Sequence, residues 1–96
     1  MKKYKIVFSP KALNDIEEAV NYYNELSPGL GNRFLTDFNL IYKAIDLNPL
    51  FASVKYDDVR VAGLKKFPFS IHYNVNKINQ VVTIVAVFNT WKEPFW

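Results

Sequence analysis

Hydrophobic side chains recur at helical spacing through most of the first half of the chain. Ahead of them, residues 3–8 alternate between polar and apolar positions, which predicts a short strand. Ser9 and Pro10 then predict a helix start, because serine can cap free backbone amides and proline is tolerated in the first turn. This helix should end at the break over residues 27–31, and a second hydrophobic stripe predicts a helix over about residues 30–47. Two amphipathic helices with so short a connection should fold back as an antiparallel hairpin.

In the second half of the chain the hydrophobic period changes to two. Residues 58–61 are expected to form a short strand, and residues 66–75 alternate so that one face of a longer strand is apolar. Residues 76–79 supply a turn, and residues 81–88, which are apolar on both faces except at Thr83, predict a central strand. The predicted fold is therefore α+β, in the order β-α-α-β-β-β, with a helical hairpin packed on a small, mostly antiparallel sheet. Periodicity leaves the strand order open.

Length and composition narrow the chemistry that this fold could carry. Ninety-six residues suffice for a single domain, so we expect residues 1–96 to form one. The sequence has no cysteine and one histidine, which excludes disulfides, thiolate nucleophiles and a multi-histidine metal centre. No apolar stretch is long enough to span a membrane, and no signal peptide is recognisable. We therefore expect the domain to bind no metal and no cofactor and to have no contact with a membrane. Its composition is compatible with a location in the cytoplasm.

The net charge of +3 belongs entirely to the second half of the chain. Residues 1–48 contain six basic and six acidic side chains, whereas residues 49–96 contain six basic and three acidic ones. We expect Arg60, Lys66 and His72 on the polar face of the sheet, where cations could stabilise phosphate charge and the histidine could move a proton. The alternative is a solvated strand face, with His72 in a structural role.

Aromatic residues are concentrated at the end of the sequence, where four of the nine residues 88–96 are aromatic. Chain termini normally fray, so such a cluster needs an explanation. One interpretation is that Trp91, Phe95 and Trp96 pack back onto the sheet, since large aromatic side chains bury much apolar area. The other is that Trp91 and Lys92 form a surface for a partner or ligand.

Four stretches, in order over nearly the whole chain, carry a family resemblance. They are Val7–Ala12, Ser27–Phe34, the pair Val59–Arg60 followed by Lys65–Phe69 and Tyr73, and Val85–Pro94. Together they resemble the RelE/ParE superfamily of bacterial type II toxins, often labelled plasmid stabilisation proteins. The resemblance implies one RelE/ParE toxin-like domain over residues 1–96, growth inhibition in the cytoplasm, and neutralisation by a co-encoded antitoxin.

The closing stretch departs from the family pattern at positions that matter for catalysis. Asn89 stands where the family usually has histidine, and asparagine cannot transfer a proton. Lys92 stands where arginine is usual, which keeps the charge but loses the planar fork. In the ribosome-dependent endonucleases of the family, basic residues on these strands serve RNA cleavage. By resemblance, Arg60, Lys66 and Lys92 are the candidate phosphate-charge stabilisers, and His72 is a weak acid/base candidate.

Three hypotheses follow from the resemblance. The first is a ParE-like toxin that binds and inhibits DNA gyrase, favoured by the missing acid or base. The second is a RelE-like, ribosome-dependent mRNA endonuclease, and the third is an inactive member of the family that only binds antitoxin. Lys65, Asn89 and Trp91 are the candidate residues for binding the target or the antitoxin. The basic second half suits an acidic antitoxin segment, and a dimer or a toxin–antitoxin hetero-oligomer is a further possibility.

Overall fold

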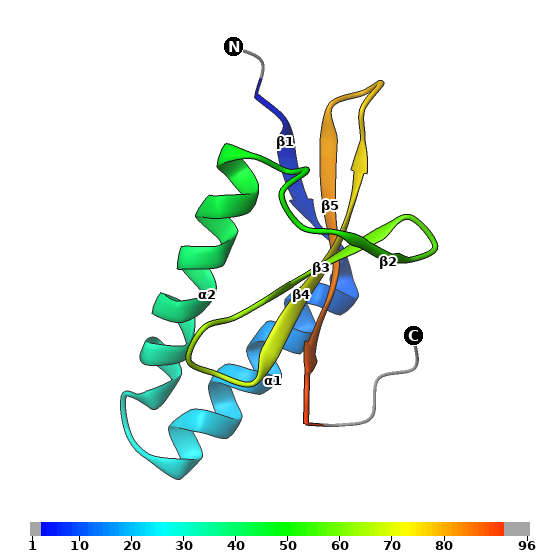
Figure 1. The fold of residues 1–96 in the computed structure, drawn as a ribbon. Coiled ribbons are helices and arrows are strands. Elements are labelled where there is room, and N and C mark those ends of the chain that lie inside the picture. The colour runs from blue at the N-terminus through cyan, green and yellow to red at the C-terminus, as the bar shows by residue number, and fades with distance from the viewer. Residues whose placement is uncertain (1–2, 92–96) are drawn as a thin grey trace.

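The computed structural model describes residues 3–91 of the chain. These residues form two helices and five strands, shown in Figure 1: β1 (Lys5–Phe8), α1 (Pro10–Leu26), α2 (Leu30–Leu47), β2 (Val54–Tyr56), β3 (Val59–Gly63), β4 (Phe69–Asn76) and β5 (Val81–Asn89). The two helices form a hairpin that packs on one face of the sheet. The predicted α+β class and helical hairpin are confirmed. Neither helix is long and apolar enough, over the described residues, to cross a lipid bilayer.

The sheet is mixed, with the strand order β1-β5-β4-β3-β2. β1 runs parallel to β5, while the other neighbouring pairs within residues 3–91 are antiparallel. The strand β5 therefore has neighbours on both sides, and its predicted central position is confirmed. The pairing passes from His72 with Ala86 to Tyr73 with Ile84, so Val85 is the extra residue of a bulge in β5.

The strand β2 was not predicted from the sequence. It ends at Tyr56, which pairs with Val59 at the start of β3, so the intervening turn has two residues. These are Asp57 and Asp58, with φ angles of 44° and 62°. Positive φ at both central residues is the geometry of the type I′ turn, whose twist matches that of the flanking strands. Aspartate tolerates this conformation better than most residues, which makes the hairpin compatible with the sequence.

Ser9 joins the start of α1 to the edge of the sheet. Its hydroxyl accepts the Ala12 amide at 3.0 Å, as expected of an N-cap, and donates to the Val85 carbonyl at 3.0 Å. Further along α1, the Asp15 carboxylate accepts the Val87 amide at 2.9 Å. The strand β1 pairs with β5 only as far as Ile84, so these two side chains satisfy backbone groups of β5 beyond the end of β1.

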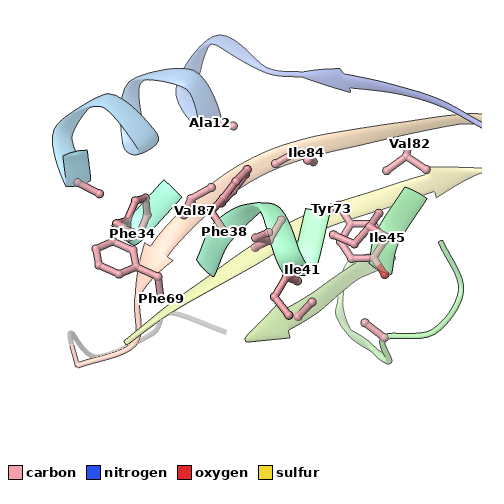
Figure 2. Packing of buried hydrophobic residues seen from close by; sticks show 14 of the residues in the cluster. Ala12, Phe34, Phe38, Ile41, Ile45, Phe69, Tyr73, Val82, Ile84 and Val87 are labelled. Carbon is pink, nitrogen blue, oxygen red and sulfur yellow. The ribbon is translucent and has the colours of Figure 1, made fainter. Parts of the chain in front are cut away.

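Aromatic rings fill the space between the hairpin and the sheet. Figure 2 shows Phe34 and Phe38 of α2 beside Phe69 of β4, and Ile45 close to Tyr73. The rings of Phe34 and Phe69 meet edge to face with their centroids 5.1 Å apart, an arrangement that aromatic pairs favour. All five side chains are buried, so the centre of the core lies under α2.

The alternating pattern placed the start of β4 too early in the sequence. Lys66, Phe67 and Pro68 belong to the loop between β3 and β4, and the strand begins only at Phe69. Phe67 nevertheless packs into the core, with its ring centroid 4.8 Å from that of Tyr23 on α1. Phe67 is apolar because it packs in the core, as an inward-facing strand residue would. The alternation of polar and apolar residues therefore extends from the strand into the loop.

Candidate functional site

Asp37 on α2 holds the loop between β3 and β4 by its backbone. Its two carboxylate oxygens accept the amides of Lys65, Lys66 and Phe67 at 3.3, 2.8 and 2.9 Å. The side chain is only 2% exposed, so these bonds form away from bulk water. Hydrogen bonds to a charged acceptor are stronger than those between neutral groups. Asp37 therefore fixes the backbone from which both lysine side chains project.

A hollow of about 350 Å³ lies between α2 and this loop. In Figure 1 the loop, drawn in yellow-green, passes beside the first turns of α2. The hollow is lined by Leu30, Arg33, Thr36, Asp37 and Leu40 from α2, and by Lys66 and Phe67 from the loop. Both Arg33 and Lys66 are exposed, and neither forms an ion pair within residues 3–91.

Arg60 on β3 is held against the connection between α2 and β2. Its guanidinium donates to the Ala52 carbonyl at 2.7 Å and to the Leu50 carbonyl at 3.3 Å. Beside it, the Tyr73 hydroxyl donates to the Pro49 carbonyl at 2.8 Å. These bonds satisfy carbonyls in a segment without regular structure, so the guanidinium has a structural role in this arrangement.

His72 lies on the other face of the sheet, where its ring is 0% exposed. The Nδ1 atom is 2.8 Å from the Tyr56 hydroxyl, and Nε2 is 3.2 Å from the Ser70 hydroxyl. The ring of Phe88 packs edge to face against it at a centroid distance of 4.7 Å. Burial lowers the pKa of His72 to about 4, with a smaller lowering from the charge of Lys11. The imidazole is therefore neutral at pH 7.

The basic surface expected from the sequence does not form. Arg60 pairs with Tyr73, whose side chain lies in the core under the helices, so it is on the helix side of the sheet. His72 points to the opposite face, because neighbouring residues of a strand alternate. Lys66 lies beside α2, in the loop. The expectation failed because it placed all three residues on regular strands of one face.

Near the end of β5, Asn89 and Trp91 lie close together in sequence and in space. The Asn89 side-chain oxygen accepts the Trp91 amide at 2.9 Å. Trp91 is 84% exposed, so the interpretation that it packs onto the sheet is wrong. Lys92, Phe95 and Trp96 lie outside the described residues. The roles of Lys65, Asn89 and Trp91 in binding stay predictions.

Sequence reasoning missed Asp37 and Arg33 as parts of a site. Both lie in the helix predicted over residues 30–47. Charged residues of an amphipathic helix usually face the solvent, so neither residue was expected to contribute to a site. The available signal was the position of Asp37 three residues after Phe34 and four before Ile41, which puts it on the apolar face of that helix. A carboxylate there must find partners, because unpaired burial of a charge is very unfavourable.

Two solved structures that share this fold come from toxin–antitoxin systems. The chain superimposes on a chain of the chromosomal ParDE toxin–antitoxin system from P. aeruginosa with a TM-score of 0.77 and 19% identity, over 90% of this chain and 95% of that one. It also matches a chain of the RelBE2 toxin–antitoxin complex from Mycobacterium tuberculosis with a TM-score of 0.61 and 13% identity, over 92% and 99% of the two chains. No protein-family model and no curated sequence matches. The predicted RelE/ParE toxin-like fold is thus confirmed.

Proposed function

We propose that this chain is the toxin of a type II toxin–antitoxin system, that it arrests growth in the cytoplasm by binding DNA gyrase, and that a co-encoded antitoxin neutralises it. The observation that carries the proposal is the fold, which superimposes over nearly the full length of a chain from a ParDE system with a TM-score of 0.77. The TM-score with the RelBE2 chain is lower, at 0.61. A fold by itself does not give an activity, so the choice of target needs evidence from the site.

The placement of the candidate catalytic residues supports binding rather than RNA cleavage. General acid–base catalysis needs a proton-transfer group that can reach the substrate and titrates near neutral pH. His72 is buried and its pKa is lowered to about 4, while Arg60 is engaged by backbone carbonyls. At the position of the family's usual histidine stands Asn89, which cannot transfer a proton. Within residues 3–91, the lysines that lie beside carboxylates are Lys3, next to Asp46, and Lys11, next to Asp15, and neither pair contains a candidate catalytic residue.

Inducible expression with two separate readouts tests the proposal. We expect growth arrest with relaxation of a reporter plasmid and with intact messenger RNA. Purified protein should inhibit supercoiling by gyrase in vitro at micromolar concentration, and the product of the neighbouring gene should relieve the inhibition and co-elute with the chain. Trp91→Ala should weaken inhibition, because Trp91 is a large and exposed aromatic side chain of the kind that anchors interfaces. Ile78→Ala, at a position 94% exposed in the turn after β4, is the matched control.

The same experiment separates the two other hypotheses. Cleavage of ribosome-bound messenger with unchanged supercoiling would replace the gyrase proposal by a RelE-like endonuclease. Expression without growth arrest, combined with antitoxin binding, would identify an inactive member that only binds antitoxin. Normal growth without any binding by the neighbouring gene's product would remove the toxin–antitoxin assignment altogether.

A further inference from the structure

The hollow beside α2 combines an apolar floor with a cationic rim. Leu30, Leu40 and Phe67 supply the apolar side chains, and Leu40 is more than half exposed although it is a large aliphatic residue. Arg33 and Lys66 stand on opposite walls, one on the helix and one on the loop. Its volume of about 350 Å³ is at the small end of the range for ligand pockets, roughly 300–1,000 Å³. It therefore has room for side chains of a bound segment, not for a folded element.

The walls of this hollow are already fixed in the free chain. Asp37 belongs to its lining and accepts three successive loop amides, so the loop cannot move away from α2 without breaking these bonds. Phe67 is anchored in the core by its edge-to-face contact with Phe34, at a centroid distance of 5.6 Å. A site that needs little reorganisation retains more of its interaction energy as affinity.

The charges of the hollow favour an anionic occupant. Asp37 is the only acidic residue among the described residues that line the hollow, and its carboxylate already accepts the loop amides. Arg33 and Lys66 form no ion pair within the described residues, so a carboxylate placed between them would gain two charge partners. The loop amides point inward to Asp37 and are not available to cradle a phosphate group. A free phosphate would therefore find only the side chains of Arg33 and Lys66 as partners, and the apolar side chains of the hollow would contribute nothing to its binding.

We infer that this hollow is the docking site for an acidic and apolar peptide segment of the antitoxin, with its carboxylates between Arg33 and Lys66 and its apolar side chains on Leu30, Leu40 and Phe67. The inference rests on the proposed function and adds to it the surface of this chain to which the antitoxin binds. Complementary charge on the rim mainly accelerates the encounter, while the apolar floor retains the bound segment.

The absence of cysteine from the sequence allows a direct test by chemical protection. Thr36→Cys places a single thiol in the lining of the hollow, and Ile78→Cys places one in the exposed turn after β4. Each variant is co-purified with the product of the neighbouring gene, and its alkylation by a maleimide is compared with that of the free chain. We expect alkylation at position 36 to be slowed about tenfold or more, as for a site over nine-tenths occupied. Alkylation at position 78 should be unchanged.

Charge reversal provides the second measurement. Arg33→Glu and Lys66→Glu should each weaken binding of the neighbouring gene's product about tenfold and reduce the salt dependence of its association rate. Lys77→Glu is the matched control, because Lys77 is an exposed lysine in the turn after β4. Its affinity should stay within about twofold of that of the unchanged chain, which allows for the weak general effect of net charge.

The outcomes separate the docking site from the function. If the neighbouring gene's product binds but position 36 reacts at the free rate, the docking inference is wrong and the toxin proposal stands. If protection at position 36 rises with the concentration of the chain alone, the occupant is a second copy, which also overturns the inference. If no complex forms and growth is not arrested, the proposed function fails, and the docking site fails with it.

Discussion

Acidification of the protein tests the burial of His72. Its imidazole is enclosed on the far face of the sheet by the Tyr56 and Ser70 hydroxyls and the edge of the Phe88 ring. Burial, with a smaller contribution from the charge of Lys11, lowers the pKa of His72 to about 4, although the charge of Asp15 partly opposes the shift. In the unfolded chain, we expect this histidine to titrate near its ordinary value of about 6.5.

The sign and size of the effect follow from proton binding. Between pH 6.5 and pH 4, the unfolded chain binds a proton that the folded chain does not, so the free energy of unfolding falls as the pH is lowered. The contribution of His72 is fully present above pH 6.5 and decreases through this window. At about 1.36 kcal/mol per pKa unit, the loss is about 2 kcal/mol at pH 5 and about 3 kcal/mol near pH 4.

Urea unfolding at pH 7.5 and pH 5.0 measures this loss, with His72→Gln as the reference protein. Glutamine can form hydrogen bonds at this site but does not titrate, so carboxylates affect both proteins alike. We expect the unchanged chain to lose about 2 kcal/mol more than the variant does on acidification. Because the sequence has one histidine, its ring proton resonance can also be followed alone by NMR. A midpoint near 6.5, or an equal loss of stability in both proteins, would refute the reasoning.

Three substitutions test other contacts by urea unfolding at pH 7.5. Asp37→Asn should lower the free energy of unfolding by about 2–4 kcal/mol, because the asparagine amide has a single acceptor oxygen for the three loop amides. A decrease below about 0.5 kcal/mol would contradict these hydrogen bonds. Gly31→Ala should lower the free energy of unfolding by about 1–3 kcal/mol, because the added Cβ atom would lie 2.7 Å from the Asn24 side chain, which accepts the Gly31 amide. The double variant Gly31→Ala and Asn24→Ala should recover part of this loss, because it removes the clashing side chain. Ser9→Ala should cost about 0.5–2 kcal/mol through the lost helix cap, whereas a Ser9→Thr variant should retain most of the stability.

The helices could be predicted because their boundaries are encoded locally. Ser9 caps α1, and α2 starts after Gly29, whose φ of 87° is readily available only to glycine. At the other end of α2, Asn48 precedes Pro49, and a residue before proline is disfavoured in the helical conformation. Each of these signals lies within one or two residues of the boundary that it sets. Such signals are readable without knowledge of the tertiary structure.

The errors arose where a contact joins residues that are distant in the sequence. Lys66 was assigned to a strand, but its backbone is held by Asp37, which lies 29 residues earlier in the chain. His72 was expected at a polar surface, but Tyr56 of the unpredicted strand β2 and Phe88 of β5 enclose it. Period-two alternation identifies which residues share a face, yet it does not show which elements cover that face. The strand β2 escaped notice because its three residues are too few to show a period.

The division of charge between the two halves of the sequence does not describe the charged surface of the folded chain. The excess positive charge lies in residues 49–96, yet the hollow brings Lys66 of that half beside Arg33 of the electrically balanced first half. In turn, the acidic residue in the same lining, Asp37, is buried, and its carboxylate accepts backbone amides of the second half. Folding thus separates Asp37 from the solvent and leaves two cations at the rim. A charge-complementary partner should respond to this local pair more strongly than to the net charge of +3, so reversing Arg33 should weaken binding more than reversing Lys77, although both changes alter the net charge equally.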